Sequence, residues 1–313
     1  MSLKIAHDWR GLSPDLRGAS VALGNFDGLH KGHQRVIAAA VEFARTHKIP
    51  SGVISFDPHP RRFFQPSAEP FRVMGPAQLA RALETLGVDI LYLLPFDAAM
   101  AGMSDHTFAH DVLAQGLGVK HVAAGFDVSF GKDRTGDGAI LQRYGRELGF
   151  GVTIVERMAT LEGVKYSSTE ARRAIAEGRP EEVADLLGHR FSIEGEVMHG
   201  DKRGRTIGFP TANIGLDDYV RPAFGVYAVR VRLPDGRTVD GVANVGRRPT
   251  VNGTDERLEV HLFDFDEDLY GQTLETEFVH RIRPEQKFPD FDTLKARIVV
   301  DAHEARRRLA KKD

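Results

Sequence analysis

The part of the chain richest in groups that could do chemistry is Gly-Asn-Phe-Asp-Gly-Leu-His-Lys-Gly-His, residues 24–33. A short apolar run at 21–23 precedes it, and apolar residues at helix spacing, from Val36 to Ala44, follow it. This pattern predicts a strand, a glycine-rich turn and a helix. Such a turn gathers backbone N–H groups and the positive end of the helix dipole at one place. His30 and His33 can point the same way there, so the turn suits the oxygens of a triphosphate.

Two other interpretations of the histidine pair are weaker. His30 and His33 could be solvated residues at the start of a helix, or half of a zinc site. The chain has no cysteine and no His-Glu-x-x-His sequence, and no carboxylate stands at obvious ligand spacing. The phosphate interpretation uses the whole pattern of glycines and the preceding strand, and false matches become rarer as a motif lengthens.

The bulk properties of the chain limit its class. A length of 313 residues suggests two domains, although one large domain is possible. The net charge of −2 gives no reason to expect nucleic acid or a membrane as a partner. The lack of cysteine excludes disulfides and fits a reducing compartment. No apolar run approaches the ~20 residues of a membrane helix, and the N-terminus lacks a signal-peptide core. We therefore expect a cytoplasmic protein.

Strands and helices alternate in the first half of the chain. Strands are predicted at 21–23, 52–56, 89–94, 119–124 and 152–155. Helices are predicted at 78–86, from Ser104 or Asp105 to about residue 115, and at 138–148. This alternation predicts an α/β domain, a doubly wound parallel sheet with helices on both faces.

Two polar loops follow predicted strands in this half. Asp57 and His59 come directly after strand 52–56, in the sequence Asp-Pro-His-Pro. A glycine-rich loop opens at Gly125, after strand 119–124. Open α/β sheets bind ligands at the carboxyl ends of their strands. Taken alone, however, the first loop is better explained as an ordinary turn fixed by its prolines.

A second possible phosphate clamp lies at the end of this half, in Ser-Ser-Thr-Glu-Ala-Arg, residues 167–172. Ser168 and Thr169 can cap a helix, and Arg172 falls in its first turn. Hydroxyls, backbone N–H groups and a guanidinium at one helix start can hold a phosphate. An ordinary capped helix is the simpler explanation.

The second half of the chain has strand character. Tyr227, Val229, Val231 and Leu233 alternate with polar residues, and a hairpin is expected at 234–236. Strands are also predicted at 258–262 and 276–282, and a final helix from about Phe291 to Leu309. We expect an antiparallel β-barrel with a C-terminal helix. The predicted domains are 1–186 and 187–313.

The segment 195–213 invites comparison with a P-loop but does not match one. The spacing between Gly200 and Gly204 is one residue short, and Arg205 stands in place of the P-loop lysine. A barrel is also the wrong context. Further along, Glu259 alternates with Leu258 and Val260, and a solvent-facing position is the usual place for such a glutamate.

These motifs together resemble one family. The 24–33 stretch is similar to the nucleotide-binding motif of the H-x-G-H nucleotidylyltransferases, in the version of the bacterial bifunctional riboflavin kinase/FMN adenylyltransferases, or FAD synthetases. The Phe-Asp-Pro-His-Pro loop, the Ser-Ser-Thr-x-x-Arg run, Gly-Phe-Pro-Thr-Ala-Asn and Glu-Val-His-Leu-Phe-Asp-Phe resemble further signatures of that family, in its order. The glycine-rich loop resembles its Gly-x-Asp-Phe-x-Phe-Gly pattern, except that Val128 replaces the first aromatic.

The resemblance implies two activities. The C-terminal barrel would phosphorylate riboflavin to FMN with ATP and Mg²⁺. The N-terminal domain would transfer AMP from a second ATP to FMN, giving FAD and pyrophosphate. Glu259 would be the general base of the kinase. His30, His33 and Arg172 would stabilise the leaving pyrophosphate.

The resemblance also assigns binding residues. The ATP site of the adenylyltransferase would comprise Gly24, Phe26, Asp27, Gly28, His30, His33, Asp127, Ser168, Thr169 and Arg172. Asp57 and His59 would belong to its flavin loop. The kinase would bind ATP with Gly200, Lys202, Gly204, Gly208, Pro210, Thr211 and Asn213, flavin near Arg283 and Glu285, and Mg²⁺ with Thr211 and Asn213.

Three rival functions remain open. A flavin sensor without catalysis is disfavoured by the intact Glu259 and histidine pair. A single-activity kinase is kept open by Val128, because the missing aromatic could contact a substrate ring. An H-x-G-H adenylyltransferase for a pantetheine or nicotinamide phosphate is disfavoured by the kinase-like second half. The oligomeric state cannot be predicted from these patterns.

Overall fold

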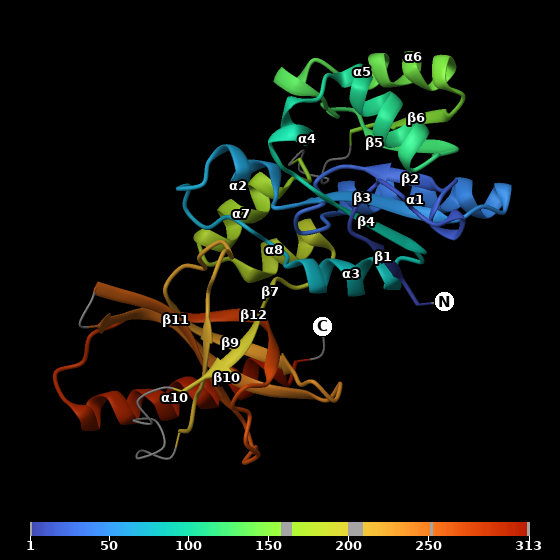
Figure 1. Ribbon diagram of the computed structural model, residues 1–313. Helices are drawn as coiled ribbons and strands as arrows, with labels where there is room; N and C mark the ends of the chain where they lie inside the picture. The colour runs from blue at the N-terminus through green and yellow to red at the C-terminus, as the bar shows by residue number, and fades with distance from the viewer. Residues whose placement is uncertain (1, 158–164, 200–208, 251–252, 312–313) are drawn as a thin grey trace. The chain divides into compact units, whose positions relative to one another are not determined.

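The computed structural model describes residues 2–157, 165–199, 209–250 and 253–311. Its contacts divide the chain into two compact units (Figure 1). The first, called here the sheet unit, comprises Met1–Ala68 and Pro76–Ser167. The second, the barrel unit, comprises Glu69–Gly75 and Ser168–Asp313. A short piece of the first half of the chain therefore belongs to the barrel unit.

The sheet unit contains a six-stranded parallel sheet with the order β1-β4-β3-β2-β5-β6. Its strands are β1 (Lys4–Ala6), β2 (Ser20–Leu23), β3 (Ser51–Asp57), β4 (Ile90–Pro95), β5 (His121–Gly125) and β6 (Gly151–Val155). The predicted parallel sheet is confirmed. The chain runs outward from β2 to β3 and β4, then returns to β5 on the other side of β2. Sheets of this kind usually bind their ligands where the strand order reverses, which is here at the carboxyl ends of β2 and β5.

Helices cover both faces of this sheet. They are α1 (Lys31–His47), α2 (Pro60–Phe64), α3 (Pro76–Thr85), α4 (Ala98–Gly102), α5 (Asp105–Thr107) and α6 (Gly138–Leu148), with the short 3-10 turns η1 (Pro14–Leu16) and η3 (Lys132–Arg134). Ser104 caps α5 by accepting a hydrogen bond from the Thr107 N–H, as predicted. The chain then continues as a π-helix, η2 (Phe108–Gly116), where an α-helix was expected.

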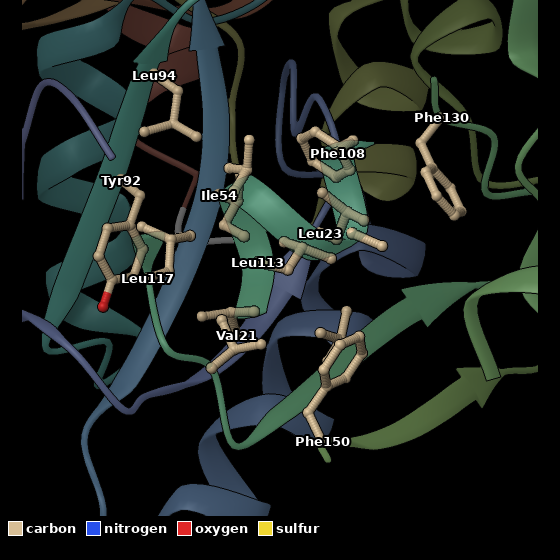
Figure 2. Close-up of a cluster of buried hydrophobic side chains, with 14 of the residues drawn as sticks. Val21, Leu23, Ile54, Tyr92, Leu94, Phe108, Leu113, Leu117, Phe130 and Phe150 are labelled. Atoms are coloured by element: carbon tan, nitrogen blue, oxygen red, sulfur yellow. The ribbon is translucent and has the colours of Figure 1, made fainter. Parts of the chain in front are cut away.

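The main core of the sheet unit lies between one face of the sheet and η2 (Figure 2). Val21 and Ile54 come from neighbouring strands, and Leu113 of η2 packs against the same cluster; all three are fully buried. Tyr92 is buried there too, and its hydroxyl donates to the Leu16 carbonyl over 2.7 Å. The helix α1 packs against β2, β3 and β5 with Val36 and Ile37 buried.

The barrel unit contains a closed antiparallel barrel with the order β10-β11-β8-β7-β12-β9. Its strands are β7 (Ser192–Met198), β8 (Ala212–Gly215), β9 (Gly225–Arg232), β10 (Thr238–Thr250), β11 (Gly253–Leu262) and β12 (Thr273–Pro284). Leu258 and Val260 are completely buried, so these alternate residues of β11 fill the interior. The predicted barrel and the hairpin between β9 and β10 are confirmed.

Among the residues described, three helices accompany the barrel: α7 (Ser168–Ala176), α8 (Pro180–Leu187) and α10 (Phe291–Leu309). The predicted final helix has these same limits, and Asp290 caps it. Ala302, Ala305 and Leu309 of α10 pack on the outer face of the barrel against residues such as Val226 and Val242. This outer face is therefore apolar on the side that α10 covers.

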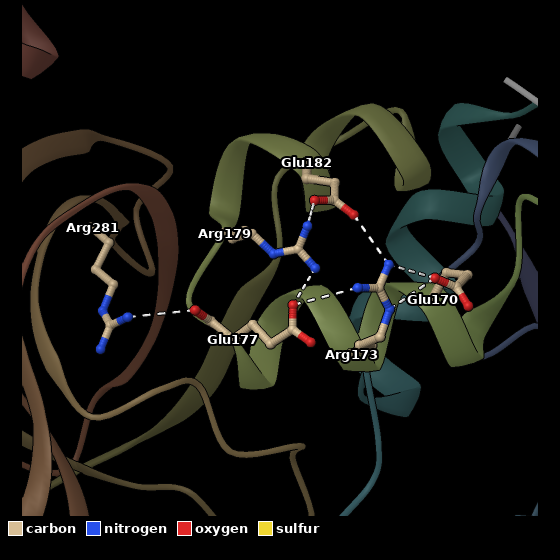
Figure 3. Close-up of polar contacts among 6 residues, drawn as sticks. All are labelled: Glu170, Arg173, Glu177, Arg179, Glu182 and Arg281. Carbon is tan, nitrogen blue, oxygen red and sulfur yellow. Dashed lines mark hydrogen bonds and ion pairs between the residues drawn. The ribbon is translucent and has the colours of Figure 1, made fainter. Parts of the chain in front are cut away.

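A network of charged side chains connects α7 to α8 (Figure 3). Arg173 pairs with Glu170 at 2.7 Å and with Glu177 at 3.4 Å. Arg179, between the helices, contacts both Glu177 and Glu182. Arg281 of β12 extends the network by donating to the main-chain carbonyl of Glu177. Exposed ion pairs are individually weak, but this linked set joins α7 to α8, and Arg281 adds one contact from β12.

One buried histidine joins three strands of the sheet unit. The imidazole of His121 in β5 bonds Ser20 Oγ in β2 and Thr153 Oγ1 in β6, each at 2.9 Å. Its ring also stacks on Phe43 of α1, with centroids 3.9 Å apart. Burial, with a smaller contribution from the charge of His47, lowers the pKa of His121 to about 4.

We therefore predict that the sheet unit loses stability as the pH falls from 6.5 to 4. In that window an unfolded histidine binds a proton that buried His121 does not, which costs about 3 kcal/mol when the window is fully crossed. Urea denaturation of the whole protein at several pH values measures the loss. The variant His121→Gln should lose less stability with acid than the wild type, whereas exposed His7→Gln should behave like the wild type. Equal acid sensitivity of His121→Gln and the wild type would contradict the prediction.

Candidate active sites

The turn between β2 and α1 has a tightly constrained backbone. Phe26, Gly28 and Leu29 have φ angles of 50°, 82° and 44°, in the left-handed region that non-glycine residues rarely adopt. Phe26 and Leu29 are each 1% exposed, so burial of their side chains holds this conformation. Asp27 is also buried. The turn is consequently a preformed cradle at the N-terminus of α1.

The two histidines of this turn lie together, as predicted. His30 caps α1, and its Nδ1 accepts a hydrogen bond from the His33 backbone N–H at 3.2 Å. The rings stack with centroids 3.5 Å apart, and Phe26 contacts His33 edge-on. Because Nδ1 of His30 is an acceptor, the neutral ring carries its proton on Nε2. That N–H can donate to a phosphate oxygen.

Gly32 provides the room for this arrangement. A Cβ at position 32 would lie 3.1 Å from the His30 ring and 3.6 Å from the Tyr166 carbonyl oxygen. The residues just before the Ser-Ser-Thr motif thus run beside the start of α1. Lys31 also lies 5.6 Å from the Tyr166 ring centroid. A side chain at 32 would therefore require the His30 ring to shift by a few tenths of an ångström.

The two loops predicted to bind ligand flank β2. Asp57 ends β3, and His59 caps α2 by accepting the Arg61 N–H at 3.1 Å. Asp127 follows β5 and pairs with Lys165 at 2.8 Å. Since β3 and β5 are the two neighbours of β2, both loops start at the edge that holds the histidine turn. The sheet unit thus gathers Gly24, Phe26, Asp27, Gly28, His30, His33, Asp57, His59 and Asp127 at one edge.

Val128 packs against the apolar core of the sheet unit. The exposed aromatic of this loop is Phe126, whose side chain is 45% accessible. The nitrogen of Lys165 lies 5.2 Å from the Phe126 ring centroid. An aromatic face is thus present in the loop, two residues before the position at which the family pattern has one.

Ser168, Thr169 and Arg172 lie on the first turns of α7, in the barrel unit. Arg172 Nε donates to the Phe71 carbonyl oxygen at 2.7 Å, and its guanidinium lies 5.5 Å from the Phe71 ring centroid. The Phe71 N–H in turn donates to the carbonyl of Asp218. Phe71 is a contact that sequence analysis missed, because it is 101 residues away along the chain and lies in a segment without periodicity.

Glu259 stands on the outer face of the barrel, because its neighbours Leu258 and Val260 point inward. It is partly buried, and it lies directly opposite Asn213 of β8 and Asn244 of β10. Residues opposite one another in antiparallel strands share a face. Glu259 therefore differs from an ordinary solvent-facing strand glutamate, because it is partly buried between two asparagines.

Asn213 is suited to a hard cation. It is 5% exposed, and its Nδ2 donates to the Thr211 carbonyl at 3.3 Å, which directs its amide oxygen away. Nearby, the Pro210 carbonyl contacts His261 Nδ1 at 2.9 Å. Within the described ranges, no group of three or more His, Cys, Asp or Glu residues could hold a metal ion. Gly200, Lys202, Gly204 and Gly208 lie outside the described residues.

Arg283 is held by a buried carboxylate of α10. Its Nε and terminal nitrogen lie 2.9 and 2.8 Å from Asp301 Oδ2, and Asp301 is 3% exposed. Arg297 contacts the other oxygen of Asp301 at 3.0 Å. Glu285 is exposed, close to Gly246, where a Cβ would lie 2.8 Å from its Oε1. Asp301 was not predicted as a partner of this region.

Two family models match the chain, one in each half. A FAD synthetase model matches residues 12–170, and a riboflavin kinase model matches residues 187–309. The chain belongs to the bifunctional riboflavin kinase/FMN adenylyltransferase family. It therefore combines two activities, phosphorylation of riboflavin and adenylylation of FMN, with ATP as a substrate.

Relatives cover nearly the whole chain. The bifunctional riboflavin kinase/FMN adenylyltransferase of Haemophilus influenzae is 43% identical over 293 residues, which are 93% of this chain and 94% of the relative. The protein of that name from Escherichia coli K12 is 41% identical and covers 92% of each chain. A crystal structure from Streptococcus pneumoniae matches with a TM-score of 0.84, 34% identity, and coverage of 98% and 99%.

The Streptococcus protein bears a different name, macrolide-efflux protein. Both family models and the relatives above name flavin enzymes instead. Among the residues that the structure describes, no helix is both long and apolar enough to cross a membrane.

We predict that Gly32→Ala lowers FMN adenylylation about 10- to 100-fold, because the added methyl displaces the His30 ring from a position where small errors are costly. Riboflavin phosphorylation should be unchanged. Gly102→Ala is the matched control, since a Cβ there meets nothing within 4 Å. Separate assays with riboflavin or FMN as the acceptor measure the two effects. Normal adenylylation by Gly32→Ala would show that the position of His30 is unimportant.

Proposed function

We propose that residues 1–186 carry the FMN adenylyltransferase and residues 187–313 the riboflavin kinase, with a separate set of ATP-binding residues for each. The family models match within these ranges. The observation that carries this proposal is the placement of two chemically different clusters. The stacked His30–His33 pair caps a helix at the switch point of the sheet, and Glu259 stands between two asparagines on the barrel.

In the kinase, Glu259 accepts the proton of the terminal ribityl hydroxyl of riboflavin as that oxygen attacks the γ-phosphorus of ATP. The O–P bond to ADP breaks, and FMN and ADP leave. Thr211 and the amide oxygen of Asn213 would hold Mg²⁺, and the bound ion would neutralise part of the phosphate charge. Gly200, Lys202, Gly204, Gly208 and Pro210 complete the proposed ATP site, and Arg283 and Glu285 belong to the flavin region.

In the adenylyltransferase, a phosphate oxygen of FMN attacks the α-phosphorus of the second ATP, and pyrophosphate leaves. The reaction needs no protein nucleophile, because FMN supplies the attacking oxygen. His30, His33 and Arg172 stabilise the negative charge that grows on the pyrophosphate. The backbone N–H groups of the turn at Gly24 and Gly28, together with Asp127, Ser168 and Thr169, position ATP. Asp57 and His59 belong to the loop for FMN.

We propose that the enzyme is cytoplasmic. Its partners are small molecules, namely riboflavin, FMN and ATP. The use of ATP by both reactions supports this location. Neither reaction involves nucleic acid or a membrane component.

We predict that Glu259→Gln and His30→Ala separate the two activities. Loss of a general base lowers phosphorylation of riboflavin by about 10²–10⁴-fold, while adenylylation of supplied FMN continues. Loss of the His30 donor lowers adenylylation by about 10²–10³-fold, and FMN then accumulates from riboflavin. Chromatography of FMN and FAD after incubation with ATP and Mg²⁺ measures both.

Each variant is the control for the other, because each should keep the activity that the other loses. A loss of both activities in a folded single variant would contradict the division of labour. Flavin binding by the wild type without either product would favour the sensor.

A further inference from the structure

Five strands of the barrel place a row of residues side by side on its outer face. The strand pairings connect Asn213 to Glu259, Glu259 to Asn244, Asn244 to Val226, and Val226 to Arg283. The first two are the proposed metal ligand and base, and Arg283 lies in the proposed flavin region. Asn244 is the polar member of this row to which no role has been assigned.

Asn244 and Glu259 are both partly buried, yet neither side chain has a hydrogen-bond partner among the described residues. Two such groups opposite one another, with their Cβ atoms about 4.5–5.5 Å apart, are arranged to bind a ligand that has several hydroxyl groups.

The order of the row matches the order of groups in the kinase reaction. Neighbouring strands are about 4.8 Å apart. Asn244 is therefore one strand away from Glu259, and Val226 is two strands away, a distance of about 10 Å. Glu259 receives the terminal hydroxyl, and ATP with its metal lies on the Asn213 side. Val226 is buried beneath α10, and it pairs with Arg283 of the proposed flavin region on the next strand. The polyol between ring and terminal hydroxyl then crosses Asn244.

Gly246 supplies an independent observation. A Cβ at this glycine would lie 3.0 Å from Asn244 Nδ2 and 2.8 Å from Glu285 Oε1. The amide and the carboxylate therefore both approach the backbone of Gly246 and occupy the space that a side chain there would need. This space links the row to the proposed flavin region.

We infer that the Asn244 side chain binds the internal hydroxyl groups of the riboflavin ribityl chain. The inference rests on the proposed kinase site. An amide suits a polyol, because its oxygen accepts and its NH₂ group donates. The contact determines specificity for an acceptor with hydroxyl groups along its chain, and it leaves ATP binding untouched.

The test compares two acceptors, riboflavin and a flavin that carries a hydroxypentyl chain, which keeps the terminal hydroxyl but lacks the internal ones. For Asn244→Ala we expect KM for riboflavin to rise about 10- to 100-fold, with KM for ATP unchanged. KM for the hydroxypentyl flavin should be the same in the variant and the wild type. Asn244→Ser, which keeps a hydroxyl, should recover part of the loss. Gly246→Ala should also raise KM for riboflavin.

Thr238→Ala is the matched control, since Thr238 lies on the same face of β10 about 20 Å away. A partly unfolded preparation lowers kcat for both acceptors alike, so the KM comparison remains valid. Equal KM increases for both acceptors, or no increase for riboflavin, would overturn the inference. No phosphorylation by the wild type would instead overturn the proposed function itself.

Discussion

The kinase half of this protein depends on the register of its strands. Hydrogen bonds between β8, β11 and β10 decide that Glu259 stands between Asn213 and Asn244. A slip of one residue would turn Glu259 into the barrel and bring Leu258 or Val260 to the outer face. That slip would expose the side chains of Leu258 and Val260, which are now fully buried, and it is therefore unfavourable. The apolar interior of the barrel therefore fixes the chemistry on its exterior.

In the sheet unit, the order of the strands determines which loops lie together. Because the strand order reverses beside β2, the loops after β3 and β5 open at the same edge as the histidine turn. The turn itself is held by the buried side chains of Phe26 and Leu29. In the proposed ATP site, its backbone N–H groups and the His30 ring would thus be ordered before ATP binds, so that little free energy is spent on ordering them.

Much of this arrangement could be predicted from the sequence, because its causes are local. Helix periodicity, the caps at Ser104 and Asp290, and the alternation in β9 and β11 each depend on neighbouring residues. The motif residues at 24–33 were predicted together and lie together. Strand β1 was missed, because three residues carry too little periodicity.

Contacts between distant segments could not be predicted. Arg172 to Phe71 and Arg283 to Asp301 join residues far apart in the chain, and nothing in the local pattern marks either partner. An individual role for Asn244 emerged only from the strand pairings, which place it beside Glu259. The π-helical form of η2 also differs from expectation, since apolar spacing indicates a helix without giving its hydrogen-bond pattern.

The central claim is that FAD made from riboflavin receives two phosphorus atoms from ATP, the γ-phosphorus in the first reaction and the α-phosphorus in the second. The most direct measurement supplies riboflavin and ATP that carries one phosphorus isotope at the γ position and another at the α position. The FMN intermediate should carry the γ label alone, and FAD should carry both labels in equal amounts. With unlabelled FMN as the acceptor, FAD should carry only the α label. FAD made from riboflavin with either label missing would contradict the account.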